Sequence, residues 1–356
     1  MARLPMTRLP MTRLPMTQSA VEEDFQTLAE PYRRELLAYC YRMLGSVHDA
    51  EDLVQETYLR AWKSYDRFEG RSSLRTWLYR IATNACLTAL EGKGRRPMPS
   101  GLGTPSAEPE AELVQRAEVP WLEPIPDVMV AGPADPAAIV TARESIRLAL
   151  IAALQHLPSR QRAVLIMRDV LSWRAAEVAE LLGTSTVAVN SMLQRARAQI
   201  SELALVEDEV TGPVTAEQRQ LLERFVAAFE NYDINALTDM FTADAVWEMP
   251  PYAGWYQTPA DIVGLIETHC PANKAGDLRM LPTAANGQPA FGTYLRDPDG
   301  TYQAFQLHVL HMTEPDGSAA TGQAGRTGPV IDHVAVFFDL TLFQRFGLPD
   351  FIPAGS

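Results

Sequence analysis

An amphipathic helix over residues 49–63 is the sequence feature that most constrains the fold of this chain. Asp49 can cap its start, and Arg60 and Lys63 close its last turn, where the helix dipole favours positive charge. One helix face is apolar and predicts a core: Val54, Tyr58, Ala61 and Trp62. A separate stripe follows Asp52, Gln55, Glu56 and Leu59, and it is either a solvated face or a docking surface.

A second helix follows after a loop. Residues 64–73 contain Gly70 and paired serines, and Ser73 is placed to cap a helix over residues 74–90. Asp52-Leu-Val-Gln-Glu56, together with Thr76-Trp-Leu-Tyr-Arg-Ile-Ala82, resembles region 2 of bacterial sigma-70-type transcription initiation factors. The resemblance implies that the stripe docks on the clamp helices of the largest subunit of core RNA polymerase.

The same resemblance assigns the loop and the second helix to the −10 promoter element. In that family they hold a base extruded from the non-template strand, which requires an apolar or stacking wall and hydrogen bonds to the base edge. Phe68 and Trp77 are alternatively core residues. The implied −10 contacts are Phe68, Ser72, Ser73, Arg75, Trp77, Arg80 and Asn84.

Residues 139–206 predict further helices that include a helix-turn-helix. Two helices, 173–182 and 186–200, flank Gly183-Thr184-Ser185, and apolar residues close the pair. With Leu157-Pro-Ser-Arg-Gln-Arg-Ala-Val and Gln194-Arg-Ala-Arg197, the segment resembles sigma region 4, which reads the −35 element and also contacts the polymerase flap. The implied contacts are Ser185, Thr186, Ala188, Asn190, Ser191, Arg195 and Arg197. The family often has basic residues where Asn190 and Met192 stand, which lowers the phosphate affinity expected of this chain.

Charge is distributed unevenly along the 356 residues. The net charge is −13, residues 139–206 carry +3, and residues 207–356 carry −13. Duplex affinity depends largely on Lys and Arg that neutralise phosphates. We therefore expect a larger partner to present the chain to DNA.

Composition excludes several other classes. No apolar run approaches a membrane span, and no signal-peptide pattern appears, so we expect a cytoplasmic protein without membrane contact. The three cysteines are far apart, which predicts neither disulfides nor a metal site, and no cofactor motif is present.

The composition of two segments predicts that they do not form globular domains. Residues 1–20 repeat Arg-Leu-Pro-Met-Thr and predict a disordered tail. Residues 97–138 hold nine of the 26 prolines and seven acids against Arg116, which predicts an acidic linker. Within it, the apolar run 119–126 around Trp121 predicts a docking point on another domain or on the partner.

The last third predicts an α+β domain. A helix over 216–232 and another near 259–268 precede strand-like runs at 278–281, 290–295, 302–311 and 330–340. The run Asp233–Pro250 resembles the SnoaL-like branch of the cone-shaped NTF2 superfamily, which includes cyclases and isomerases. The resemblance implies a pocket, with a small-molecule ligand as one option, lined by Trp247, Glu248, Met249, Tyr252, Trp255, His308 and Asp339. His308 beside an acid could transfer protons, although a hydrogen-bonded structural role is commoner, and we assign no catalytic residue.

Together these features predict two all-α sigma domains followed by a cone-shaped α+β domain. The expected ranges are 1–20 tail, 21–96 region 2, 97–138 linker, 139–206 region 4, 207–214 linker and 215–356 SnoaL-like domain. The order resembles the extracytoplasmic-function (ECF) sigma group, in its subset with a SnoaL-like extension. We expect a non-enzymatic factor that binds core RNA polymerase and promoter DNA. The acidic C-terminal domain is expected to regulate it in cis, either by packing on the basic 139–206 block or by keeping that block off DNA. The alternatives are a free-standing helix-turn-helix regulator and a SnoaL-like enzyme with a DNA-binding front.

Overall fold

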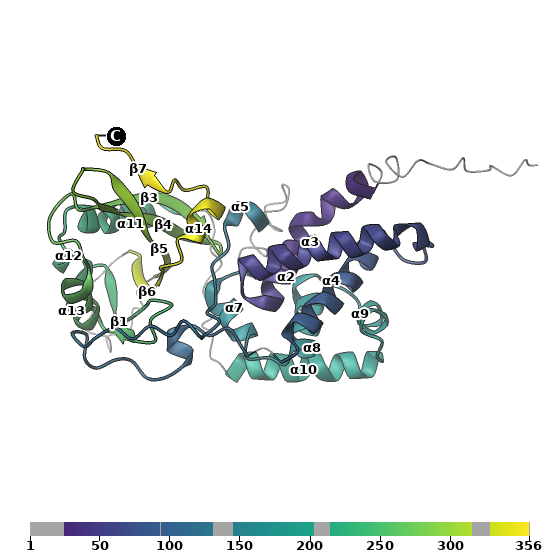
Figure 1. Ribbon diagram of the computed structural model, residues 1–356. Coiled ribbons are helices and arrows are strands. Elements are labelled where there is room, and N and C mark those ends of the chain that lie inside the picture. Colours follow the sequence, from purple (N-terminus) through teal and green to yellow (C-terminus); the bar gives the residue numbers. More distant parts are fainter. Residues whose placement is uncertain (1–24, 93, 131–144, 203–213, 315–327, 356) are drawn as a thin grey trace, which may run out of the picture.

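A computed structural model describes residues 25–92, 94–130, 145–202, 214–314 and 328–355, shown in Figure 1. Helices fill one half of the molecule, and a sheet with its covering helices fills the other. We refer to residues 25–92 as the first helical unit, 94–130 as the connector, 145–202 as the second helical unit and 214–355 as the C-terminal domain. The expected tail 1–20 lies outside the described residues, as does most of the expected linker 207–214.

Three α-helices form most of the first helical unit, after a helical stretch at residues 25–29. Gly45 ends the first of them in a left-handed conformation, and Ser46 caps the next by accepting a hydrogen bond from the Asp49 amide. The prediction that Asp49 caps this helix is therefore wrong, because the helix begins two residues earlier. Ser73 does cap the third helix, as predicted. The helices are α2 (Arg33–Leu44), α3 (Val47–Ser64) and α4 (Leu74–Leu90).

The second helical unit contains the predicted helix-turn-helix. Gly183 has a positive φ of 61° and closes the first of the two helices, which leaves room for the turn before the next. Val178, Leu181, Val189 and Leu193 are all buried between them. The elements are α7 (Leu148–Leu154), α8 (Ser159–Leu165), a π-helical turn (Ile166–Val170), α9 (Ala175–Leu182) and α10 (Thr186–Glu202).

The C-terminal domain is a mixed seven-stranded sheet in the order β2-β1-β6-β5-β4-β3, with β7 on β5. Only β1 and β6 run parallel, and every other described pair is antiparallel. The strands are β1 (Phe241–Glu248), β2 (Trp255–Gln257), β3 (Leu278–Ala285), β4 (Gln288–Arg296), β5 (Tyr302–Thr313), β6 (Val330–Phe337) and β7 (Phe351–Ile352). The helices are α11 (Ala216–Glu230), α12 (Asn235–Thr238), α13 (Pro259–His269) and α14 (Thr341–Arg345).

Each face of this sheet joins a different core. On the inner face, Trp247, Phe291, Leu310 and Val334 pack with buried residues of α11, α12 and α13. The outer face, which includes Ala290, Leu307, Val309 and Ala335, is continuous with the core of both helical units. Alternation along each strand separates the two sets, and the outer one fastens the domain to the helices.

The connector packs along the protein instead of acting only as a spacer. It contains a short helix, α5 (Asp127–Val130), and it passes from the first helical unit to the sheet and back (Figure 1). Leu122 and Ile125 are fully buried. The predicted docking point around Trp121 therefore docks within this chain. No helix among the described residues has the length and apolar character needed to cross a membrane.

Candidate polymerase and promoter surfaces and the domain junction

The predicted polymerase stripe lies on α3 as an exposed surface. Asp52, Gln55 and Leu59 are exposed, and the Leu59 side chain is 55% accessible although it is apolar. Glu56 is half-buried and forms a 2.6 Å ion pair with Arg60 one turn later. The other face of α3 buries residues such as Val54 and Ala61 in the bundle. A substitution in the stripe should therefore change the exposed surface of α3 without disturbing the packing of its buried face.

The loop before α4 presents a small aromatic wall. Phe68 lies 4.9 Å from Trp77 between ring centroids, and it stacks on Tyr65 at 6.3 Å. Phe68 and Trp77 are both half-buried, so they pack on the bundle and still offer an accessible ring surface. The Ser73 hydroxyl caps α4 by accepting a hydrogen bond from the Thr76 amide. Ser72 is half-buried and Asn84 is exposed. All of the predicted −10 residues, including Arg75 and Arg80, therefore lie along this loop and α4.

Arg75 and Arg80, also predicted −10 contacts, are instead engaged inside the molecule. Arg75 forms a bidentate ion pair with Glu35 of α2, and its guanidinium lies 5.7 Å from the Trp173 ring centroid. The hydrogen bond to Glu35 raises the pKa of Arg75 further, which keeps it charged. Arg80 Nη2 donates to Glu180 Oε1 of α9 at 3.0 Å. Two groups on the −10 side of α4 therefore contact the second helical unit.

An aromatic contact also joins the two helical units. Trp173, just before α9, is 6% exposed and packs against Tyr79 of α4 with ring centroids 5.1 Å apart. Buried Arg162 of α8 donates to the backbone carbonyl of Met43 in α2. Burial lowers the pKa of Arg162 to about 10, so it remains charged at neutral pH.

The predicted −35 residues lie on the open side of α10 and its preceding turn. Ser185, Thr186 and Asn190 are exposed, while Ala188 and Ser191 are half-buried. Arg195 is exposed, and Arg197 is ion-paired with Asp169 at 2.7 Å. Val187, 76% exposed, adds an apolar contact surface beside them. The surface suits a major groove, but it carries few unpaired cations.

The seven predicted pocket residues do not gather in one pocket. Trp247 and His308 lie on the inner face of the sheet, whereas neighbouring Glu248 points to the outer face, because successive strand residues alternate. Met249 is buried, and exposed Asp339 accepts hydrogen bonds from Thr341.

Tyr252 and Trp255 hold the connector. Gln115 donates to the Tyr252 hydroxyl, and the Trp255 indole donates to the Gly103 carbonyl, each at 3.0 Å. Backbone hydrogen bonds join the same two stretches, including Ser106 N to Trp255 O at 2.7 Å. These two predicted pocket residues thus fix the path of the connector along the domain.

His308 is fully buried among aromatic rings and contacts an amide rather than an acid. Its Nε2 is 2.7 Å from the Gln306 amide nitrogen, which can only donate, so the ring proton resides on Nδ1. That Nδ1 and the Trp247 Nε1 have no hydrogen-bond acceptor among the described residues. Burial lowers the pKa of His308 to about 3 and keeps the ring neutral.

A β-hairpin of the C-terminal domain reaches into the junction of all the other parts. Asn286, in the turn between β3 and β4, is fully buried. Its Oδ1 accepts from the Ile125 amide at 2.9 Å, and its Nδ2 donates to the Tyr41 hydroxyl at 2.8 Å and to the Ile146 carbonyl at 2.5 Å. One side chain therefore binds α2, the connector and the start of the second helical unit.

A second set of contacts joins α14 to the start of α3. Glu123 of the connector accepts from Ser46 Oγ and pairs with His48 Nδ1, both at 2.8 Å. The other nitrogen of His48 contacts Thr341 at 3.1 Å. Arg345 forms a 2.9 Å ion pair with Glu51. These contacts fix the same helix that carries the exposed stripe.

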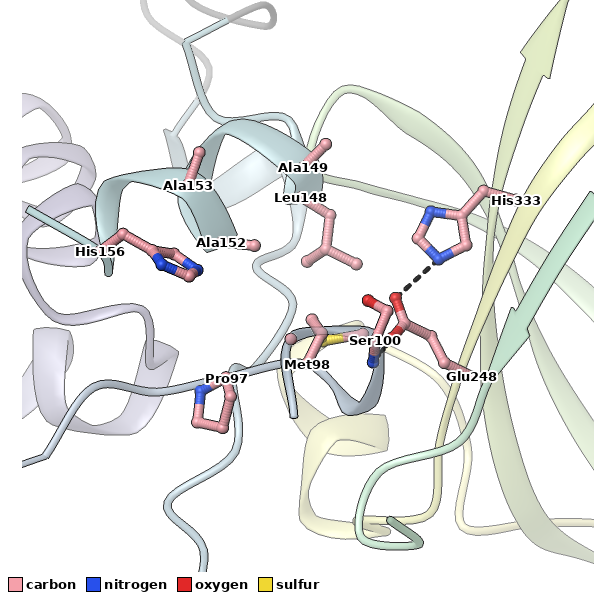
Figure 2. Close-up of a pocket in the computed structure, with 11 residues that line it drawn as sticks. Pro97, Met98, Ser100, Leu148, Ala149, Ala152, Ala153, His156, Glu248 and His333 are labelled. Atoms are coloured by element: carbon pink, nitrogen blue, oxygen red, sulfur yellow. Dashed lines mark hydrogen bonds and ion pairs between the residues drawn. The ribbon is translucent and has the colours of Figure 1, made fainter. Parts of the chain in front are cut away.

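A pocket of about 410 Å³ opens where α7, the connector and the sheet meet (Figure 2). Glu248, 1% exposed, reaches it from β1 and pairs with His333 Nε2 at 2.7 Å, while its other oxygen accepts from the Ser100 amide at 2.9 Å. Burial raises the pKa of Glu248, but His333 and the Ser100 amide lower it more, and the net shift is downward. The remaining lining residues are Pro97, Met98, Gly101, Leu148, Ala149, Ala152, Ala153 and His156. No group of three His, Cys, Asp or Glu residues in the described ranges could hold a metal ion.

Sequence reasoning did not single out Asn286, Glu123 or His333. Asn286-Gly287 is a two-residue pair with positive φ at both positions, which is the usual signal of a tight hairpin. That signal could have located the turn. It could not have shown that the turn is buried against residues 140 to 245 positions away.

Comparisons with known proteins agree with this architecture. Sigma-70 region 2 matches residues 28–96, Sigma-70 region 4 matches 147–200, and the SnoaL-like domain matches 222–337. The fold and its surfaces thus define a sigma-70-type initiation factor with a SnoaL-like extension. The ECF RNA polymerase sigma factor SigG of Mycobacterium tuberculosis is 59% identical over 328 residues, covering 92% of this chain and 84% of the relative. This chain belongs to the family of ECF RNA polymerase sigma factors.

A second relative shares the three-part arrangement. SigJ of Mycobacterium tuberculosis is 28% identical over 298 residues, covering 81% of this chain and 87% of the relative. The crystal structure of SigJ superposes with a TM-score of 0.53 at 22% identity, covering 92% of this chain and all of the other, and this supports the fold alone. The predicted family and fold class are confirmed. Sigma factors are non-enzymatic initiation factors that bind core RNA polymerase and promoter DNA.

Proposed function

We propose that the exposed stripe of α3 is the polymerase contact of this sigma factor. The observation that carries the proposal is the division of α3 into a buried face and an exposed one that includes a solvent-facing leucine. Asp52, Gln55, Glu56 and Leu59 contribute acid, amide and apolar surface, a mixture that suits an interface better than a purely solvated face. The Phe68 loop with α4 then reads the −10 element, and α10 reads the −35 element.

Charge reversal on the stripe tests this assignment. Asp52→Lys combined with Glu56→Lys should abolish binding of core polymerase in a pull-down, because both acidic groups of the proposed interface are replaced by groups of opposite charge. Thermal unfolding should stay near wild type, since the buried face is unchanged. Glu217→Lys, an exposed acid on α11, is the matched control. Holoenzyme formation by the double variant at wild-type affinity would show that the stripe is only a solvated face.

We further propose that the C-terminal domain regulates the factor in cis by holding the two helical units against each other. We call this arrangement closed. The closed arrangement pairs Arg80 with Glu180 and places the Arg75 guanidinium 5.7 Å from the Trp173 ring, so it engages two residues that we assign to the −10 interaction. The domain supports that arrangement through Asn286, which hydrogen-bonds to both helical units. The contact with the second helical unit is made at Ile146 and Leu148, while Arg197 of α10 pairs within its own unit. We therefore attribute the closed arrangement to hydrogen bonds and apolar packing instead of the general attraction between opposite charges inferred from the sequence.

Removal of residues 207–356 tests the regulatory role. Run-off transcription by reconstituted holoenzyme should rise, because the helical units lose the hairpin that holds them together. If exposed charges held the units closed, the rise in transcription would disappear at high salt. If buried contacts hold them, the rise should persist at every salt concentration. Equal output from truncated and full-length protein, at matched polymerase occupancy, would refute regulation in cis.

A catalytic C-terminal domain is the remaining candidate activity. We propose that the domain is not an enzyme, because the ring of His308 is neutral, buried and bonded to an amide instead of an acid. We also propose that the protein acts in the cytoplasm, where polymerase is found. Isomerase or cyclase turnover by the full chain, abolished in His308→Gln, would contradict the non-catalytic assignment.

A further inference from the structure

The pocket between α7, the connector and the sheet combines features that a ligand site needs. Its volume of about 410 Å³ falls within the range of small-molecule sites. It lies on the outer side of the sheet, away from the inner-face core that holds Trp247 and His308. Three separate parts of the chain form its walls (Figure 2).

The walls are mostly apolar and leave space through small side chains. Ala149, Ala152 and Ala153 form the α7 side, and Leu148, Met98 and Pro97 surround the remaining apolar volume. Figure 2 shows Leu148 and Met98 on the side of the cavity nearest Glu248. Because a thioether makes favourable contacts with ring edges, Met98 suits an aromatic body.

The polar end of the pocket holds a carboxylate and its histidine partner. Glu248 is a buried carboxylate whose oxygens each accept one hydrogen bond, from His333 and from the Ser100 amide. A carboxylate offers about four acceptor positions, so each oxygen has capacity for a further donor. At the other end stands His156, just after α7, whose pKa is lowered by burial and by Arg95, so its ring stays neutral and does not repel a bound cation.

We propose that this pocket binds a small organic cation, a primary amine on a compact aromatic body, with the ammonium on Glu248. The ligand would touch α7 of the second helical unit, the connector at Met98 and Ser100, and β1 and β6 of the C-terminal domain. Its affinity depends on the closed arrangement, so binding stabilises closure and lowers transcription. This consequence rests on the proposed regulation in cis, whereas binding itself does not.

The binding test uses the full chain and three defined probes. Benzylamine, 2-phenylethylamine and tryptamine are titrated by calorimetry, with 2-phenylethanol as the neutral counterpart of the second. At least one amine should bind with 1:1 saturation, and 2-phenylethanol should bind about tenfold more weakly than 2-phenylethylamine because it lacks the charge-assisted bond. Absence of saturable binding by all three amines, or equal binding of the alcohol, would overturn the proposal.

Paired variants locate the site. Glu248→Gln removes the charge, and Ala152→Phe fills the cavity from a half-buried position. Each should weaken amine binding about tenfold or more. The matched controls are Asp332→Asn, which neutralises another His-paired carboxylate on the same sheet, and Ala111→Phe at an exposed connector position. Both controls should bind like wild type, and undiminished binding by folded Glu248→Gln and Ala152→Phe would overturn the site.

Transcription assays separate this inference from the regulatory proposal. If amine binding is real and closure regulates, the binding amine should reduce run-off transcription by wild type but not by Ala152→Phe. Saturable binding without any change in transcription would refute the coupling to closure while leaving the site itself established. Repression that persists in Ala152→Phe would assign the effect to another site and overturn the proposed link.

Discussion

Replacement of Asn286 should open the junction while leaving the sheet intact. In Asn286→Ala the Ile125 amide loses its acceptor and the Ile146 carbonyl loses its donor, both in a fully buried setting. Each unsatisfied buried group costs about 1–3 kcal/mol. The Tyr41 hydroxyl still donates to the Glu123 carbonyl at 2.7 Å, so its loss is smaller. Hydrogen-bond loss alone therefore amounts to about 2–6 kcal/mol.

Backbone strain adds a separate contribution that a matched variant can remove. Asn286 has φ of 56°, and alanine in the left-handed region costs about 1–2 kcal/mol that glycine avoids. Asn286→Gly should therefore show the hydrogen-bond effect with little strain, and Asn286→Asp should keep the Ile125 bond while losing both donors.

The assay is amide hydrogen exchange followed by run-off transcription. Amides of α7 and of connector residues near Ile125 should exchange faster in the alanine and glycine variants, while those of β4 and β5 stay protected. Transcription should rise in parallel. A glycine variant with wild-type exchange at the junction, within about 0.5 kcal/mol, would refute the reasoning that this side chain holds the parts together.

Two further predictions concern single groups. Glu180→Ala removes the ion-pair partner of Arg80. Because both side chains are well exposed, the stabilisation lost is at most about 1 kcal/mol, and transcription should rise less than about fivefold. The difference between variant and wild type should disappear at high salt. His308 has a folded pKa of about 3 against an unfolded value near 6.5, so between these values only the unfolded chain takes up the proton. Stability should therefore fall by about 1.4 kcal/mol per pH unit as pH drops through this window, and urea unfolding of His308→Gln should lack that slope.

Each of these predictions has a contrary outcome. A salt-independent effect of Glu180→Ala would show that the contact acts through packing instead of charge. Equal pH slopes for wild type and His308→Gln between about pH 6 and 4 would show that His308 titrates normally and is not sealed in the core.

Helix boundaries were predictable where local chemistry decides them. Ser73 caps α4 and Gly183 ends α9, both as the sequence indicates. At the start of α3 the cap is Ser46, and Asp49, which lies in the first turn, forms an ion pair with Arg96. The capping hydrogen bond is local, whereas the ion-pair partner of Asp49 lies 47 positions away in the sequence.

The domain junction was not predictable from one sequence. The acidic, proline-rich composition of the connector indicated a spacer, yet Leu122 and Ile125 are buried by partners from distant segments. Neighbouring strand residues Trp247 and Glu248 were both expected in the cone, although alternation allows only one of them to face inward. The packing of the helices on the outer face of the sheet likewise depends on contacts between distant segments of the chain.

The path of the connector also has a consequence for the order in which the protein matures. Its residues rest on strands that the ribosome makes after both helical units, since about 150 residues of this sequence follow the second unit. At roughly 5–20 residues per second, that interval lasts roughly ten to thirty seconds. During this time both promoter-reading units have emerged without the hairpin that closes them. Under the proposed regulation in cis, a chain interrupted after residue 202 would therefore lack the hairpin that holds the two helical units together, and the restraint is acquired later in synthesis than the units on which it acts.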